Sequence, residues 1–181
     1  ANSPTVAEAE LRKTSGYDGK FIDSCKVFWG HEAAVGYFPQ DHKALSEPGM
    51  TIMEWLHQWD GSASNEEIRG LLGQMLFQKD DALKKTDVLS GGEAARLIFC
   101  KLMLLKYNFL VFDEPTNHLD LESINALNIA LQRYPGTVLL ATHDHDLIDE
   151  VATRIWHFER DHSLTDFKGP YAEYEQQAVV A

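Results

Sequence analysis

The chain has 181 residues, of which 44% are hydrophobic, so it can bury one sizeable core and fits one domain better than two. Its 16 Lys and Arg against 28 Asp and Glu give a formal net charge of −12, which disfavours a long phosphate backbone as a partner and predicts little direct nucleic-acid binding by this segment. No apolar run approaches the ~20 residues that span a bilayer, and Cys25 and Cys100 lack zinc-site spacing, which favours a cytoplasmic protein with no membrane partner.

The first part of the chain is expected to hold an irregular start followed by two strands. Residues 1–24 are polar and weakly patterned, apart from a short helix expected near 6–13. Strands are predicted at 26–29 and 34–38, which are enriched in aromatic residues and valine and are separated by a turn.

From Met50 to Leu89 the pattern becomes helical and predicts a small helical insert. Ser64 begins a capping-box sequence, Ser-Asn-Glu-Glu, that is typical of a helix start. Apolar residues follow at helix spacing, namely Ile68, Leu71, Leu72, Met75 and Leu76.

The second half alternates helices and strands. In chain order, the expected elements are a helix to about Lys106 with Leu97, Ile98, Leu102 and Leu105 inside, a strand at 108–112, a helix at 121–133, a strand at 137–142, a helix near 146–152 and a strand near 154–158. The end of the chain is either a turn with a short terminal helix or a frayed tail. This order predicts an α/β domain with a mainly parallel sheet. Right-handed crossovers would place Asp113 and His143, which follow two of the strands, on the same edge of the sheet.

Two adjacent carboxylates, Asp113 and Glu114, follow the apolar strand Phe-Leu-Val-Phe. A carboxylate in this position can hold Mg²⁺ directly or through water, and a neighbouring one can polarise a water for attack on phosphorus. The pair therefore suits metal-assisted phosphoryl transfer to water. An isolated Asp-Glu pair is more often two solvated loop acids, so the interpretation depends on the other motifs.

Three further features accompany the pair. The sequence Ser90-Gly91-Gly92 opens a helix, where a capping serine and backbone N–H groups can bind an anion, although such a start is also an ordinary capped turn. Gln40 follows a strand and can offer an amide oxygen to a metal, or be a surface residue. His143 follows another strand and can donate to a terminal phosphate, or be structural.

Together and in this order, the motifs resemble the nucleotide-binding domain of ATP-binding cassette (ABC) proteins. YFPQ matches the glutamine loop, LSGGE the signature motif, FLVFDEP the Walker B strand with its glutamate, NHLD the D-loop and THD the histidine switch. Three features are similar to the ABC-F branch, in particular to the second cassette of bacterial members. They are the sequence EPTNHLD, the short insert and the ending DFKGPYAEYE. The resemblance covers roughly residues 26–175.

The resemblance implies a P-loop NTPase-like fold, ATP and Mg²⁺ as cofactors, and a role for each motif residue. Asp113 would anchor the magnesium shell, Glu114 would be the general base, and His143 would sense the γ-phosphate. Gln40 would link metal and water to the insert, and Asp120 would face a partner cassette. The signature residues Ser90, Gly91 and Gly92 would bind the γ-phosphate of ATP held by that second cassette. As an ABC-F protein, the chain would act on the ribosome in translation.

The chain departs from the family at its start, where neither a Walker A loop nor the strands before it can be identified. The pattern GxxxxGK followed by Ser or Thr does not occur: the only Gly-Lys pair, Gly19-Lys20, has Thr14 in place of the first glycine and Phe21 in place of the hydroxyl. Counting back from the glutamine loop places the family's lysine at Glu8 or Ala9. Residues 1–24 are therefore interpreted as a divergent start.

Three hypotheses remain open from the sequence. The chain is part of a hydrolysing ABC-F cassette, or a module that lends its signature motif to an intact cassette and hydrolyses nothing itself. The third hypothesis is a metal centre formed by His118 with the stretch His143-Asp144-His145-Asp146, which the expected turn after residue 142 disfavours.

Overall fold

The structure is a computed structural model that describes residues 29–38, 49–117, 119–159 and 163–178. The chain divides into two compact units, one ending at Ala141 and one beginning at Thr142. The helix expected near 6–13, residues 26–28 of the strand expected at 26–29, and Gln40 lie outside the described residues, and Trp29 is not part of a strand.

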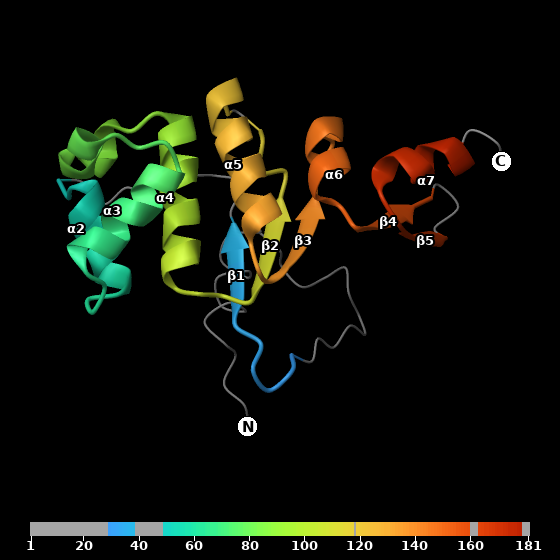
Figure 1. Ribbon diagram of the computed structural model, residues 1–181, viewed down its shortest axis with the longest axis horizontal. Helices are drawn as coiled ribbons and strands as arrows, with labels where there is room; N and C mark the ends of the chain where they lie inside the picture. The colour runs from blue at the N-terminus through green and yellow to red at the C-terminus, as the bar shows by residue number, and fades with distance from the viewer. Residues whose placement is uncertain (1–28, 39–48, 118, 160–162, 179–181) are drawn as a thin grey trace, which may run out of the picture. The chain divides into compact units, whose positions relative to one another are not determined.

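A three-stranded parallel sheet forms the centre of the first unit (Figure 1). Its order is β1 (Val35–Phe38), β2 (Phe109–Asp113) and β3 (Thr137–Ala141), so the Walker B-like strand is central. Tyr37 pairs with Val111, which in turn pairs with Leu139. All three strands were expected from their apolar runs, and the parallel arrangement is confirmed. Because parallel strands share a carboxyl edge, Asp113 and Ala141 end side by side.

The helix α4 (Gly91–Leu104) packs on β1 and on α5 (Leu121–Arg133), and its buried face supplies much of the core. Phe99 of α4 lies 6.0 Å from Phe112 of β2, whose ring is also 5.0 Å from that of Phe38, measured between centroids. These three rings are almost completely excluded from solvent. One detail of the expected inner face of α4 differs: Leu104 is buried, whereas Leu105 is the half-buried C-cap, because α4 ends two residues before the predicted end at Lys106.

Residues 50–89 form short helices, as the sequence predicts. They are α2 (Ile52–Trp59), α3 (Asn65–Gln74) and the 3-10 helices η2 (Lys79–Leu83) and η3 (Thr86–Val88). In Figure 1, α4 stands between the sheet and the helices α2 and α3, both of which contact it.

The limits of α3 explain which of its predicted apolar residues are buried. Ser64 caps the helix by accepting a hydrogen bond from the Glu67 N–H at 3.1 Å, and Ile68, Leu72 and Met75 are buried as expected. Leu76 is an exception: it lies beyond the end of the helix with φ 61 and is 47% exposed. The helical period therefore stops two residues before the apolar pattern does.

The second unit consists of α6 (His145–Val151), β4 (Arg154–Phe158), β5 (Leu164–Lys168) and α7 (Tyr171–Ala178). The predicted strand at 154–158 is confirmed, but not as part of a parallel sheet: β4 pairs antiparallel with β5, which the sequence analysis did not predict. The β5 segment, Leu-Thr-Asp-Phe-Lys, has too few apolar residues to reveal a strand, and an Arg154–Asp166 ion pair of 2.6 Å joins the two strands instead. No helix in the described part of the chain is long and apolar enough to cross a membrane.

Candidate nucleotide-binding site

The acidic pair lies at the carboxyl end of the central strand, as predicted. Asp113 is the last residue of β2 and pairs with Ala141 of β3. Glu114 adopts φ 47, a left-handed conformation that few non-glycine residues take, and its N–H donates to the Ala141 carbonyl oxygen at 2.8 Å. The chain therefore turns sharply at Glu114 while the backbone hydrogen bond to β3 is kept. Such conformations are concentrated at functional sites, where the surrounding structure holds them.

Asp113 is exposed, so its carboxylate can receive a ligand. The charge of Asp113 acts on Tyr37 of β1. Burial raises the pKa of the Tyr37 hydroxyl, and the negative charge of Asp113 raises it further. Carboxylate oxygen is the hard donor that Mg²⁺ prefers, and this ion usually takes one or two protein carboxylates together with waters and substrate phosphates. Among the described residues no three His, Cys, Asp or Glu side chains gather as a metal cluster. The donor set at Asp113 fits a magnesium ion that arrives with a nucleotide.

The signature motif forms the capped start of α4. Ser90 is the N-cap: its hydroxyl accepts a hydrogen bond from the Glu93 N–H at 3.2 Å, while the Glu93 carboxylate accepts one from the Ser90 N–H at 2.8 Å. Ser90 and Gly91 are exposed, so this helix N-terminus, where the partial positive charge of the helix dipole lies, faces solvent. The predicted capped start of the helix is present in the structure.

Gly92 brings the signature motif against the D-loop. A Cβ atom built at Gly92 would lie 2.5 Å from the Ser123 Oγ atom and 2.9 Å from an Asp120 carboxylate oxygen, so only glycine fits here without a shift. The starts of α4 and α5 therefore touch, and the structure brings Gly92 and Asp120 together.

Asp120 is the N-cap of α5 and accepts a hydrogen bond from the Ser123 N–H at 2.7 Å. This bond is the main reason that the pKa of the Asp120 carboxyl is lowered, and the positive charge of Arg96 lowers it further. Asp120 is thus an exposed carboxylate held ionised at the start of a helix.

His143 belongs to the second unit, in the turn between β3 and α6. The Asp144 N–H donates to the Thr142 hydroxyl at 3.1 Å, and Asp144 caps α6. The turn expected after residue 142 is present, so His143 and His145 do not share a strand face. His145 contacts Tyr171 of α7, with 3.0 Å between its Nδ1 and the Tyr171 Oη atom.

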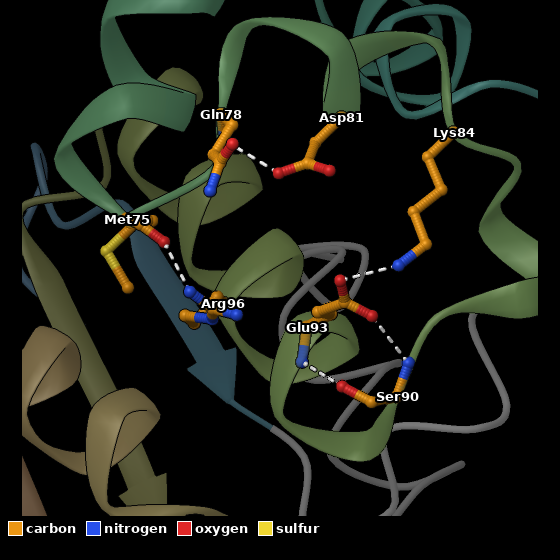
Figure 2. A network of polar contacts seen from close by, with 7 residues as sticks. All are labelled: Met75, Gln78, Asp81, Lys84, Ser90, Glu93 and Arg96. Carbon is orange, nitrogen blue, oxygen red and sulfur yellow. Dashed lines mark hydrogen bonds and ion pairs between the residues drawn. The ribbon is translucent and has the colours of Figure 1, made fainter.

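Two residues near the site were not found by sequence reasoning. Lys84 forms an ion pair of 2.6 Å with Glu93, and Arg96 donates to the Met75 carbonyl oxygen at 3.1 Å (Figure 2). A lysine in a polar turn has no sequence feature that separates it from a solvated surface residue. The spacing of three residues between Glu93 and Arg96 was only a weak signal that Arg96 lies near the signature turn. It places the two side chains next to each other on the surface of α4.

The parallel sheet, the acidic pair at the end of its central strand and the glycine-rich start of α4 define a P-loop NTPase-like α/β domain. The sequence profile of the ABC transporter family matches residues 9–117, more than half of the chain. The chain therefore belongs to this family and is an ATP-binding cassette domain.

Relatives of known sequence confirm the resemblance to the ABC-F branch. The probable ATP-binding protein YbiT of Escherichia coli O157:H7 is 44% identical over 84% of this chain and 29% of its own length. ABC transporter F family member 5 of Arabidopsis thaliana is 38% identical over 83% of this chain and 22% of its own length. ATP-binding protein Uup of Escherichia coli (strain K12) is 34% identical over 88% of this chain and 26% of its own length. The chain spans less than a third of the length of each of these relatives.

Solved structures share the fold. The archaeal ribosome recycling factor aABCE1, solved with the ribosomal stalk protein aP1, matches with a TM-score of 0.67 and 23% identity over 98% of this chain and 35% of its own. A dimeric ATP-binding cassette in a post-hydrolysis state, bound to ADP and Pi, matches with a TM-score of 0.61 and 21% identity over 75% of this chain and 63% of its own. At these identities the likeness establishes the fold alone.

Proposed function

We propose that the chain is a partial cassette of an ABC-F type ATPase, which binds ATP with Mg²⁺ and takes part in its hydrolysis. The observation that carries this proposal is the left-handed turn at Glu114, which places a second acidic residue directly after Asp113 at the carboxyl end of the central strand. In this view residues 1–181 form one partial domain, with a helical insert at 50–89 and a divergent start at 1–24.

Each motif residue has a proposed task. Asp113 holds the magnesium ion, Glu114 accepts a proton from the attacking water, and His143 donates a hydrogen bond to the γ-phosphate. Gln40 contributes an amide oxygen beside the metal. The bound ion supplies charge neutralisation to the phosphates.

The signature side of the domain is proposed to serve a second cassette. The γ-phosphate of ATP held by that cassette is bound at the start of α4 by the Ser90 hydroxyl and by the backbone N–H groups of Gly91 and Gly92, since the Ser90 N–H already donates to Glu93. Asp120 faces the same partner. The cassette structure that matches this chain with ADP and Pi is described as dimeric, which supports a paired arrangement.

A second candidate function is favoured by one feature of the sequence, the lack of any GxxxxGK pattern followed by Ser or Thr. In this candidate the chain hydrolyses nothing itself and only lends its signature turn to an intact cassette. The capped α4 start is complete in either case.

Calorimetric titration with Mg-ATP separates the two. The chain is compared with a version whose start is replaced by a Walker A segment and the strands before it. If only the repaired chain binds Mg-ATP, the unmodified chain acts through a partner. In the repaired chain, Glu114→Gln should bind ATP normally and lower its turnover at least ~10²-fold. Full turnover by that variant would exclude Glu114 as the base.

We further propose a cytoplasmic protein that acts in translation. The support is the naming of ABC-F relatives and the fold shared with an archaeal ribosome recycling factor. The net charge of −12 predicts that this segment binds RNA weakly by itself. Sedimentation with ribosomes at increasing salt tests this point, and strong, salt-sensitive retention of the chain would contradict the prediction of weak binding.

A further inference from the structure

A hydrogen-bond network connects the segment before α4 with the signature turn (Figure 2). The Lys84 Nζ atom lies 2.6 Å from one oxygen of the Glu93 carboxylate. The other oxygen of this carboxylate accepts the Ser90 N–H at 2.8 Å, and the Ser90 hydroxyl accepts the Glu93 N–H at 3.2 Å. One oxygen of the Glu93 carboxylate therefore bonds to the helical insert through Lys84, and the other bonds to the backbone of the signature residue Ser90.

The backbone of Lys84 is itself fixed. Its N–H donates to the Asp81 carbonyl oxygen at 2.9 Å, and its carbonyl oxygen accepts the Ile52 N–H at 2.9 Å. Ile52 begins α2 and is fully buried. At the other end of η2, the Asp81 carboxylate accepts the Gln78 N–H at 2.7 Å. The backbone of Lys84, from which its side chain reaches Glu93, is thus held by the start of α2 and by η2.

The charges at this point favour an ionised Glu93. Burial would raise the pKa of the Glu93 carboxyl, but the hydrogen bond from Lys84, the N–H of Ser90 and the ammonium charge together outweigh burial and lower it. The side chains of Lys84 and Glu93 are 33% and 18% exposed, so the pair is partly shielded from water. A protonated Glu93 would lose acceptor strength toward Ser90.

We propose that Lys84 is a positioning residue for the signature motif: it holds Glu93 in the orientation that fixes Ser90, so that the helical insert controls the phosphate-binding start of α4. A movement of α2 and η2 would shift Lys84 and, through the ion pair, the Glu93 carboxylate. The signature turn at Ser90 would then be less well ordered. The inference rests on the proposed function in one respect, namely that the turn receives the γ-phosphate of ATP.

The alternative is an ordinary surface ion pair. Such pairs typically contribute little to stability and do not order the groups beyond them. The two cases differ at Ser90, which Lys84 does not touch directly. A readout at Ser90 therefore distinguishes positioning from local charge pairing.

The experiment compares the unmodified chain with Lys84→Met, Lys84→Arg and the neighbouring control Lys85→Met. Two quantities are measured by NMR without nucleotide: the pKa of the Glu93 carboxyl and the hydrogen-exchange rate of the Ser90 amide. In Lys84→Met the Glu93 pKa should rise and Ser90 exchange should speed up about tenfold. Lys84→Arg should restore both values, since it keeps the charge and a donor, and Lys85→Met should change neither.

A third measurement adds Mg-ATP and an intact cassette that carries a Walker A loop. Lys84→Met should weaken Mg-ATP-dependent pairing with that cassette about tenfold, with rescue by Lys84→Arg. If Ser90 exchange in Lys84→Met is unchanged, or Lys85→Met has the same effect, the positioning role is wrong. If Ser90 exchange responds but the unmodified chain never pairs with the cassette, the proposed function fails while the control of the turn by Lys84 stands.

Discussion

The N–H of Glu114 and the carbonyl oxygen of Ala141 are joined by a hydrogen bond of 2.8 Å that ties the end of β2 to the end of β3. Glu114 makes this bond from the left-handed conformation, at φ 47. An L-residue pays about 1–2 kcal/mol for that conformation. The neighbouring Pro115 is almost completely buried, which helps to hold the turn.

The first prediction compares two variants that both lack the carboxylate. Glu114→Gly should be more stable than Glu114→Ala by about 1 kcal/mol or somewhat less, because glycine avoids the strain of the left-handed conformation. The greater flexibility of glycine in the unfolded state offsets about 0.4–1 kcal/mol of this gain. Urea unfolding of the two variants measures the difference. An advantage for alanine of about 0.4–1 kcal/mol, which is the effect of the unfolded state alone, would show that the turn is not strained.

Much of this architecture was predictable because the signals were local and strong. The helix α5 was expected between Leu121 and Arg133, and β2 was expected from a continuous apolar run. The left-handed turn at Glu114 was not predictable, since glutamate has no preference for it. The pairing of β4 with β5 and the contact of Lys84 with Glu93 depend on tertiary geometry, which neither residue spacing nor composition encodes.

The candidate site was predictable to a similar degree. The signature turn and the D-loop cap are where the motifs imply, and the contact of Gly92 with Asp120 joins them. Their chemistry with ATP and Mg²⁺ stays a prediction, as do the roles of Gln40 and His143.

The second prediction concerns the contact of α4 with α5. In Gly92→Ala the new methyl group would overlap the Ser123 hydroxyl and approach Asp120 to 2.9 Å. We expect a loss of stability of about 1–3 kcal/mol, although alanine favours helix. In Gly73→Ala, at an exposed position of α3, the new carbon has no atom within 4 Å outside the backbone of its own helix, so this control should gain about 0.5–1 kcal/mol. Thermal or urea unfolding measures both, and a stabilised Gly92→Ala would show that the helices are not in tight contact.

The third prediction concerns the Lys101 ammonium, which lies 3.4 Å from the centre of the Trp59 ring. Lys101 of α4 is only 7% exposed, and Trp59 ends α2, so the pair attaches the helical insert to the core. A double-mutant cycle of Trp59→Leu and Lys101→Met should give a coupling energy of about 0.5–2 kcal/mol. Trp59→Phe keeps an aromatic face and should lose less than Trp59→Leu. A coupling energy near zero would mean that the ring and the ammonium do not stabilise each other.

The last prediction uses the lowered pKa of Asp120, which results first from the Ser123 N–H and also from the charge of Arg96. A carboxyl whose pKa is lower in the folded state stabilises the fold above its unfolded pKa, about 3.9 for Asp, and this contribution is lost as the pH falls through the folded value. At pH 7, Asp120→Ala should cost about 1 kcal/mol, while Asp120→Asn should cost much less, since asparagine caps a helix equally well.

The pH dependence separates the cap from the charge. Urea unfolding between pH 7 and pH 3 should show the advantage of the unmodified chain over Asp120→Ala shrinking below about pH 4. Asp120→Asn has no titrating group at this position, so its advantage over Asp120→Ala should stay constant. Effects of other acids, Glu93 among them, cancel in these differences because all three proteins share them. If the gap between the unmodified chain and Asp120→Ala does not change with pH, the carboxylate of Asp120 is not held by the start of α5.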